Sequence, residues 1–245
     1  MIKIIKCANG TEVGEVAADY VTKLLLTKDN AILGLPTGST PIPMYQKIVS
    51  WSIQSKFNWD KVTTFNLDEY YNLSPLYIDQ SYAHFMDENL FSHININKSN
   101  IHFPYYQGMN ELDINHYDTL IDSMGGLDLT ILGVGTDGHI AFNEPGSELN
   151  SITRLVKLSY QTRKDNSRFF NDDIKNVPEF AVTMGLETIL KSHRILLLVS
   201  GKSKEQALQH LLEAKEFDPN WPVTSLINAK ELILITDLNT NNQNK

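Results

Sequence analysis

Short and nearly continuous apolar runs recur along the chain, separated by polar or glycine-containing segments. Strands that are covered on both faces have this unbroken hydrophobicity, whereas half-exposed strands alternate apolar and polar residues. The pattern therefore predicts buried strands at Ile2–Lys6, Ala31–Leu35, Val62–Asn66, Leu127–Gly133, Arg194–Val199 and Leu232–Thr236.

Apolar residues at helical spacing occupy the segments between these runs. From Val13 to Leu25 they form one stripe on a helix, with Thr11 as the expected N-cap. Strands that alternate with helices in this way favour an α/β protein, in which helices cover both faces of a mostly parallel sheet. Further helices are expected at Met44–Ile53, Tyr82–Leu90, Asn115–Ser123, Pro178–Leu190 and Ser203–Ala214.

The composition favours a single domain. The chain has 245 residues, of which 42% are hydrophobic, enough to bury about 70–75% of the surface that the unfolded chain exposes. No linker rich in proline or glycine divides it. We therefore expect one domain over residues 1–238, followed by a polar tail at residues 239–245.

The net charge, the cysteine content and the length of the apolar runs argue against several functional classes. The 21 Lys and Arg against 29 Asp and Glu give a net charge of −8, which disfavours nucleic acid as a partner because phosphate contacts need clustered positive charge. Cys7 is the only cysteine, so neither an internal disulfide nor a Cys-x-x-Cys site can form. The N-terminal residues lack the order of a signal peptide, and no run approaches the ~20 apolar residues that span a bilayer. We expect a cytoplasmic protein with no membrane partner.

Catalytic and binding residues are expected just after the predicted strands, because ligands of parallel sheets bind beyond the carboxyl ends of the strands. The first such segment, Leu33–Pro41, reads LGLPTGSTP and leads from a strand through a small polar turn into a helix. Such a turn aims backbone N–H groups at an anion, so Gly38, Ser39 and Thr40 are candidate phosphate ligands. The glycine spacing of nucleotide and dinucleotide loops is absent, which argues against ATP and NAD as cofactors. The alternative is an ordinary helix-capping turn.

The second segment is Phe65–Tyr71, FNLDEYY, which places Asp68 and Glu69 at the end of the third predicted strand. A carboxylate that leaves an apolar strand can be held partly desolvated, which raises its pKa and makes it a useful base. The alternative is an acidic pair on a solvated turn.

The third segment, Leu132–Ser147, reads LGVGTDGHIAFNEPGS and brings Asp137, His139 and Glu144 within eight positions. Two carboxylates that flank one imidazole can fix its tautomer and support its protonated form, which makes a proton shuttle. We expect no metal, because the His-Glu-x-x-His spacing is absent and no second histidine is near. The remaining alternative is a structural histidine in a turn.

Two basic residues follow further along the chain. Arg168 lies in the segment NSRFF, and Lys204 ends the segment GKSK just after the fifth predicted strand. Arginine offers a bidentate fork and lysine a point charge to a phosphate. A single Arg or Lys is by default a solvated surface residue. We therefore expect Arg168 and Lys204 to bind a phosphate only in combination with the turn at Gly38.

Together these segments resemble the glucosamine-6-phosphate deaminase family. The resemblance extends from about Ile32 to Leu212. The G-x-G-x-D-G-H core is shared with 6-phosphogluconolactonases, whereas F-N-E-P after it and L-D-E-Y in the third-strand loop distinguish the deaminases. The segments that match the family pattern in order are LGLPTGSTP, FNLDEYY, SYAHFM, LGVGTDGHIAFNEPGS, NSRFF and TMGLETIL.

The resemblance implies a three-layer α/β/α sandwich with a Rossmann-like sheet. It also implies conversion of glucosamine 6-phosphate and water into fructose 6-phosphate and ammonia, without metal or organic cofactor. Asp68 would move a proton from C2 to C1 of the opened sugar. His139 would assist ring opening, oriented by Asp137 and Glu144. The phosphate would be bound by Gly38, Ser39, Thr40, Arg168 and Lys204.

Near the C-terminus the chain departs from the family pattern P-A-S-x-L-Q-x-H, because Ile227 and Ala229 replace the usual Gln and His. Longer relatives form hexamers regulated by N-acetylglucosamine 6-phosphate, using residues near Arg154 and a longer C-terminal region. The departures therefore argue against that regulation and for a monomer or small homo-oligomer that binds a sugar phosphate. Two alternatives use the same residues: a lactonase or isomerase acting on another sugar phosphate, and a catalytically silent sugar-phosphate sensor.

Overall fold

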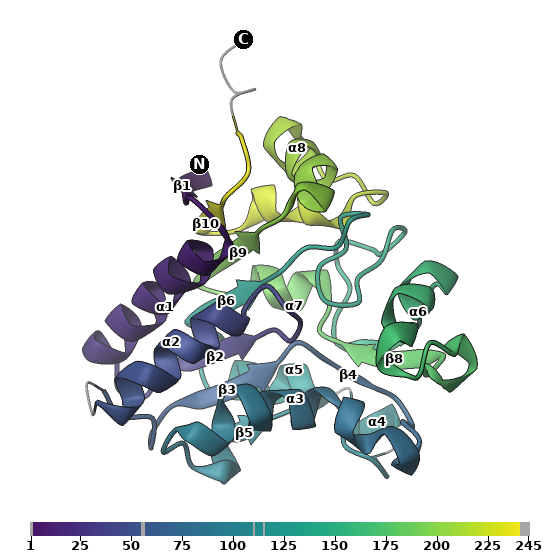
Figure 1. Ribbon diagram of the computed structural model, residues 1–245, viewed down its shortest axis with the longest axis horizontal. Coiled ribbons are helices and arrows are strands. Elements are labelled where there is room, and N and C mark those ends of the chain that lie inside the picture. The colour runs from purple at the N-terminus through teal and green to yellow at the C-terminus, as the bar shows by residue number, and fades with distance from the viewer. Residues whose placement is uncertain (1, 55–56, 110, 115, 241–245) are drawn as a thin grey trace.

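The computed structural model describes residues 2–54, 57–109, 111–114 and 116–240 and contains two sheets with the helices that cover them (Figure 1). The strands are β1 (Ile2–Lys6), β2 (Ile32–Leu35), β3 (Thr63–Asn66), β4 (Asp68–Tyr70), β5 (Ile101–His102), β6 (Leu129–Leu132), β7 (Arg154–Lys157), β8 (Phe180–Thr183), β9 (Arg194–Val199) and β10 (Leu232–Thr236). The α-helices are α1 (Gly10–Thr27), α2 (Ile42–Ile53), α3 (Tyr82–Asn89), α4 (Glu111–Ile114), α5 (His116–Ser123), α6 (Tyr160–Asn166), α7 (Leu186–Leu190) and α8 (Glu205–Glu213).

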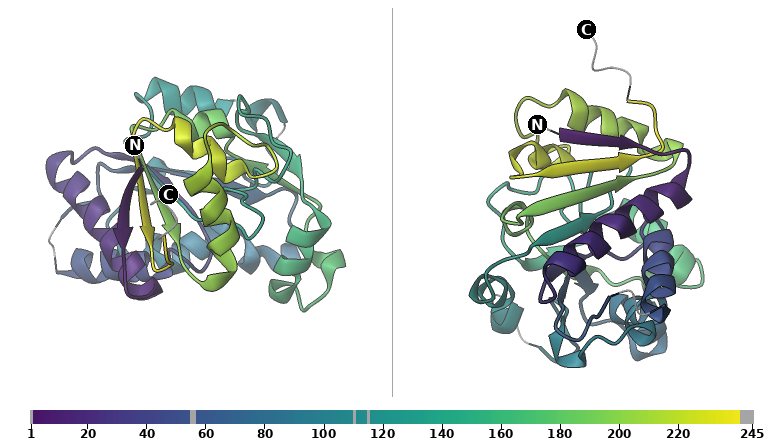
Figure 2. Two further views of the ribbon diagram at one scale, coloured as in Figure 1. Left: turned by 90° about the horizontal axis from the view of Figure 1, so that it is seen from above. Right: turned by 90° about the vertical axis from the view of Figure 1, so that its left-hand side faces the viewer.

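The larger sheet has seven parallel strands in the order β1-β10-β9-β6-β2-β3-β5. Successive residues of its central strands enter opposite cores. Leu196 and Leu198 of β9 pack in the core shared with α1 and α2, whereas Ile195 and Leu197 pack in the core shared with α7 and α8. This double burial explains the unbroken hydrophobicity of the runs. The three layers are visible in Figure 2, and the predicted fold class is confirmed.

The smaller sheet is antiparallel and has the order β4-β8-β7. Leu67 connects it to the larger sheet, because its N–H donates to the Leu35 carbonyl at 3.2 Å while its own carbonyl accepts from Met184 N at 2.7 Å. Tyr70, Phe142 and Phe170 pack in a separate core beside the smaller sheet. This sheet therefore extends from the carboxyl edge of the parallel strands, where the site residues are expected.

Two sequence-based assignments of local structure were wrong. The N-cap of α1 is Asn9, whose Oδ1 accepts from Glu12 N at 3.0 Å, and Thr11 lies inside the helix. The side chain of Glu12 in turn accepts from the N–H of Ala8, the residue before the cap, so a second hydrogen bond holds the N-terminus of the helix. The helix expected at Pro178–Leu190 is instead the strand β8 followed by the short helix α7.

The other predicted strands and helices agree with the structure to within a few residues at their ends. Asn115, the predicted start of one helix, and residues 241–245 of the predicted tail lie outside the described residues. Among the described helices, none combines the length and the apolar content that crossing a bilayer requires.

Candidate active site

The carboxyl ends of β9, β6, β2 and β3 lie at one edge of the larger sheet, because these strands are neighbours and run parallel. The segments that follow them are those selected from the sequence. The chain therefore brings the turn at Gly38, the strand end at Asp68, the loop at His139 and the turn at Lys204 to the same edge.

Asp68 begins β4 and is almost completely buried, with 7% of its surface exposed. Among the described residues, no group donates a hydrogen bond to its carboxyl oxygens. Burial, and to a lesser extent the neighbouring charge of Glu69, raises the pKa of Asp68 to about 8. Asp68 is thus a carboxyl group that holds its proton near neutrality and becomes a strong base once ionised.

Glu69 is also buried but has a different environment. Its carboxylate accepts hydrogen bonds from the backbone N–H groups of Tyr70 at 2.8 Å, Tyr82 at 3.0 Å and Ala83 at 2.8 Å. Burial raises the pKa of Glu69, and these three donors oppose that rise. Because Tyr82 and Ala83 open α3, Glu69 ties β4 to the N-terminus of that helix.

His139 is bound to Asp137 through its ring. The distance from His139 Nδ1 to Asp137 Oδ1 is 2.6 Å, and the backbone N–H of His139 donates to the same oxygen at 3.2 Å. Partial burial raises the pKa of Asp137, but the hydrogen bond and charge of His139 outweigh it and bring the pKa down to about 2. Since an ionised carboxylate only accepts, Nδ1 carries a proton and Nε2 is left to exchange one with a ligand.

Gly135 allows the imidazole to lie directly against the backbone. A Cβ atom at this position would come within 2.2 Å of the Cε1 and Nδ1 atoms of His139. The Gly135 N–H also donates to the carbonyl of His139 at 2.8 Å, which closes the loop. The second glycine of the G-x-G pattern, Gly135, is therefore required by the close contact between its backbone and the imidazole of His139.

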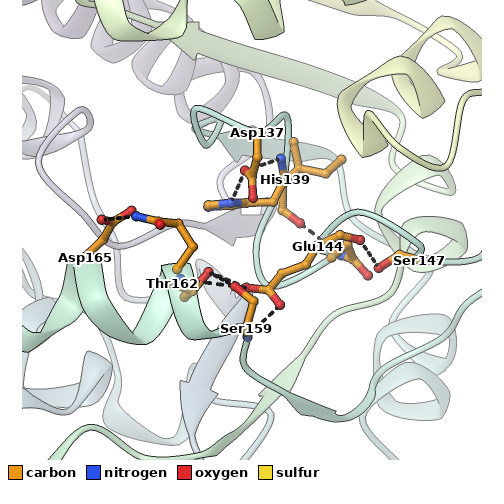
Figure 3. A network of polar contacts seen from close by, with 10 residues as sticks. Asp137, His139, Glu144, Ser147, Ser159, Thr162 and Asp165 are labelled. Carbon is orange, nitrogen blue, oxygen red and sulfur yellow. Dashed lines mark hydrogen bonds and ion pairs between the residues drawn. The ribbon is translucent and has the colours of Figure 1, made fainter. Parts of the chain in front are cut away.

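Glu144 lies away from the imidazole and faces α6 (Figure 3). Its carboxylate accepts from Ser159 N at 2.9 Å, from Ser159 Oγ at 2.9 Å and from Thr162 Oγ1. Among the described residues, His139 is bound by Asp137 and has no hydrogen bond to Glu144. The predicted arrangement of two carboxylates around His139 thus differs from the structure, in which only Asp137 orients the ring.

The strand that carries Asp68 and the loop that carries His139 are joined through β8. Thr183 of β8 is the register partner of Asp68, and its Oγ1 accepts from Phe142 N at 3.0 Å. The ring of Tyr82 stacks on Phe142 with centroids 5.9 Å apart. These contacts bring the Asp68 strand against the segment that begins three residues after His139.

The turn at Gly38 has the geometry of an open anion loop. Gly38 has a φ of +97°, and no atom lies within 4 Å of the place where its Cβ would be. None of the backbone N–H groups of Gly38, Ser39 and Thr40 donates to another described group. The helix α2 that follows has no side-chain cap.

Lys204 and Arg168 are close enough to affect each other. Burial lowers the pKa of Lys204, Asp137 and Asp165 raise it, and the charge of Arg168 lowers it further. The guanidinium of Arg168 lies 4.7 Å from the ring centroid of Phe169. In the described part of the chain neither cation is hydrogen-bonded or ion-paired through its side-chain nitrogens. Two neighbouring cations that no described carboxylate contacts directly are suited to bind an anion.

Several residues that shape the site were not predicted. Tyr82 and Thr183 lie in the segments SYAHFM and TMGLETIL, which match the family pattern, but their contacts with the site come from tertiary packing and gave them no predicted role. Ser159 and Thr162 do carry a signal, since Ser159 is the N-cap of α6 and accepts from Thr162 N at 3.1 Å. Within the described residues, no group of three or more His, Cys, Asp or Glu side chains is arranged to hold a metal ion.

Comparison with known proteins places this geometry in a family. The family model described as glucosamine-6-phosphate isomerases/6-phosphogluconolactonase matches residues 8–234, which is most of the chain. The chain belongs to this family. The match includes the strand end at Asp68, the His139 loop and both basic segments.

Individual members of the family are similar over nearly their whole length. The chain is 44% identical to a glucosamine-6-phosphate deaminase of Malacoplasma penetrans, over 95% of this chain and 97% of the relative. A solved monomeric glucosamine-6-phosphate deaminase is 38% identical with a TM-score of 0.89, covering 96% of this chain and 97% of that one. The 6-phosphogluconolactonase of Thermotoga maritima is 26% identical with a TM-score of 0.73, over 96% and 98%.

Proposed function

We propose that the protein is a glucosamine-6-phosphate deaminase that converts glucosamine 6-phosphate and water into fructose 6-phosphate and ammonia. The observation that carries the proposal is the buried Asp68 carboxyl group, which receives no hydrogen bond from any residue that the structure describes and lies beside the His139 loop. A deaminating isomerase needs one base that serves two adjacent carbons, and Asp68 has the burial and the free oxygens for that role. The relatives that carry this name support the same assignment.

In this proposal the phosphate is the anchor of the substrate. Lys204 and Arg168 supply the charge, and the loop from Gly38 to Thr40 supplies backbone N–H groups. Holding the phosphate fixes the sugar relative to Asp68 and His139, and such orientation lowers the barrier by several kcal/mol.

Ring opening is assigned to His139. Its Nε2 removes the proton of the anomeric hydroxyl and delivers a proton to the ring oxygen as the bond between that oxygen and C1 breaks. Asp137 keeps Nδ1 protonated and stabilises the imidazolium in between. The product is the open aldehyde with its amino group still on C2.

Isomerisation and deamination follow at Asp68. The ionised carboxylate takes the proton from C2, and the C1 oxygen takes a proton from the ammonium group of the substrate, which gives an enolamine. Asp68 then returns the first proton to C1, which leaves an alcohol at C1 and a protonated imine at C2. Water adds to this imine, and ammonia leaves as the C2 ketone forms. The protonated amino group of the substrate lies next to C2, so its positive charge lowers the pKa of Asp68 when the substrate binds.

The test is an ammonia-release assay on the purified protein with glucosamine 6-phosphate, run beside a hydrolysis assay on 6-phosphogluconolactone. Ammonia release without lactone hydrolysis is expected. Lactone hydrolysis without ammonia would assign the other activity of the family, and binding of glucosamine 6-phosphate without turnover would assign a sensor.

We also propose that the protein acts as a monomer, because a 38% identical relative with a TM-score of 0.89 is described as monomeric. Light scattering during gel filtration, with and without N-acetylglucosamine 6-phosphate, tests this assembly state. The cytoplasmic location, the absence of nucleic-acid partners and the single-domain boundary at residue 238 stay predictions.

A further inference from the structure

Asp237 lies directly after β10, at the carboxyl edge of the larger sheet. Its Oδ2 accepts from the hydroxyl of Ser200 at 2.7 Å, and its Oδ1 accepts from the N–H of Gly201 at 3.2 Å. Both donors follow β9, the strand that pairs with β10. Asp237 therefore binds the turn at the end of the neighbouring strand, and the reaction proposed above gives it no role.

The place of Asp237 is set by its own strand and by the start of α1. The carbonyl of Thr236, a buried residue, accepts from Cys7 N at 2.9 Å, so the end of β10 stays paired with the segment that leads into the helix. At Gly10, the first residue of α1, a Cβ atom would lie 2.6 Å from Ser200 Oγ and 3.9 Å from Asp237 Oδ2. The helix therefore packs directly against the pair that Asp237 and Ser200 form.

The turn after β9 has little to hold it from within. Gly201 has a φ of +90°, and no atom lies within 4 Å of the place where its Cβ would be. Glycine has the largest conformational freedom of all residues, and Gly201 is also exposed. The 3-10 turn Lys202–Lys204 that follows has no side-chain cap. Among the described residues, Asp237 is the side chain that binds this glycine.

Gly201 joins Asp237 to Lys204. Its N–H donates to the carboxylate, and its carbonyl accepts from the backbone N–H of Lys204 at 3.0 Å. The charges that shift the pKa of Lys204 come from Asp137, α6 and the turn after α6, so its ammonium lies near the proposed site. Asp237 is not among these charges, and its effect on Lys204 therefore runs through the backbone. A lysine has a long and flexible side chain, so its ammonium depends on the backbone from which it starts.

We propose that Asp237 is a positioning residue for Lys204: by binding the N–H of Gly201, it holds the turn from which the ammonium reaches the phosphate of the substrate. This inference rests on the proposed function, in which Lys204 binds that phosphate. Without the carboxylate the turn populates other conformations, and the apparent affinity falls with the fraction of molecules that keep the competent one. In the described part of the chain Asp237 has no hydrogen bond to Asp68 or His139, so the chemical step should be unaffected.

The main variant is Asp237→Ala, which removes both acceptor oxygens. We expect KM for glucosamine 6-phosphate to rise about tenfold, which corresponds to about 1.4 kcal/mol and is the size of effect that a lost hydrogen bond to a charged group can have. The inhibition constant of inorganic phosphate should rise in parallel, while kcat and its pH profile stay within about twofold. Asp237→Asn keeps the shape and an oxygen that can accept from Gly201. It should raise KM only about threefold, and it replaces the alanine variant if that variant does not fold.

The decisive measurement combines Asp237→Ala with Lys204→Met. In the Lys204→Met background Asp237→Ala should raise KM no further, because the residue through which it acts is gone. The matched control is Asp128→Ala. Asp128 is also half-buried and accepts from a backbone N–H, that of Ile32 at 2.8 Å, but it lies at the amino edge of the same sheet. This control should lower the free energy of unfolding and leave KM unchanged.

The outcomes separate this inference from the proposed function. An unchanged KM in Asp237→Ala overturns the inference, and so does a rise of KM that is equally large with and without Lys204 or in Asp128→Ala. A lower kcat with a shifted pH profile at constant KM overturns it as well, because the effect would then lie in the chemical step. If the wild-type protein releases no ammonia, only the proposed function fails. Calorimetry with inorganic phosphate then tests the inference: Asp237→Ala should weaken this binding about tenfold, and a wild-type protein that binds no phosphate would overturn the inference too.

Discussion

The strand end at Asp68–Glu69 and the loop from Asp137 to Glu144 each contain one aspartate and one glutamate, and the two regions use them alike. In both, the glutamate binds the N-terminal turn of a helix, α3 or α6. The aspartates differ. Asp68 is buried, receives no hydrogen bond in the described part of the chain and has a pKa of about 8, whereas Asp137 is bound to His139 and has a pKa of about 2. Environment thus makes one carboxyl group a base and the other a permanent anion.

The largest effect should come from Asp68→Asn, which removes the base of the first region. We expect kcat to fall by about 10²- to 10⁴-fold, the range for general base catalysis, with substrate affinity nearly unchanged. Exchange of the C2 proton, followed by deuterium incorporation from heavy water, should disappear. A variant that still exchanges this proton would show that Asp68 is not the base.

The pKa of Asp68 also predicts a pH dependence. Because the folded-state pKa of about 8 lies above the unfolded value, the folded protein binds the additional proton between about pH 4 and pH 8, and stability falls as pH rises through that window. Asp68→Asn should therefore raise the free energy of unfolding at pH 8, by ~2–5 kcal/mol, and leave it almost unchanged at pH 4. Urea unfolding at both pH values measures the difference. In wild-type protein, kcat/KM should rise toward pH 8 as Asp68 ionises.

Asp137→Asn tests the second region and should have the next largest effect. An amide in place of the carboxylate no longer fixes Nδ1–H or stabilises the imidazolium, so kcat should fall about 10²-fold. His139→Gln should lower kcat by a similar factor, and the double variant should be no slower than the more damaged single variant, because the pair acts as a unit. Additive losses would contradict a shared role.

Lys204→Met is expected to have a smaller effect that is confined to phosphate binding. Removing the cation should raise KM about tenfold, because a hydrogen bond to a charged group contributes about 1.5–3 kcal/mol. The matched control is Lys202→Met, since Lys202 lies in the same short turn and is exposed. Equal increases of KM in the two variants would show a general charge effect in place of a phosphate contact.

Glu69→Gln should have the smallest effect on activity and act mainly on stability. Three backbone N–H groups lose a charged acceptor, so the free energy of unfolding should fall by ~1–3 kcal/mol. Glu88→Gln is the control, because Glu88 is exposed on α3, the helix whose N-terminus Glu69 binds. A kcat loss as large as that of Asp68→Asn would mean that Glu69 does more than hold α3.

The sequence predicted six of the seven strands of the parallel sheet, because the central strands are buried on both faces and therefore continuously apolar. It did not predict the edge strand β5, which has two residues. Nor did it predict β4, β7 and β8, which have three or four residues each and are stabilised by pairing with distant segments. The apolar residues of Phe180–Thr183 fit a helical pattern as well as a strand, and only the register with Asp68 distinguishes the two.

For the candidate site, residue type and position after a strand were enough to select Asp68, Asp137 and His139. Residue type and position did not predict which residues bind Glu144. Its partners Ser159 and Thr162 reach it only through the packing of α6. Spacing within one loop suggested that Glu144 faces His139, whereas tertiary contacts direct it to the helix.

Gly133 and Gly135, the first two glycines of the loop that carries His139, differ in the side chains that they would tolerate. At Gly135 even a methyl group would collide with the imidazole, so any library that enlarges this position would displace His139. At Gly133, two residues earlier, a side chain would meet nothing within 4 Å, and the backbone needs no left-handed conformation there. Substitutions in this loop should therefore be tolerated at residue 133 and should displace His139 at residue 135.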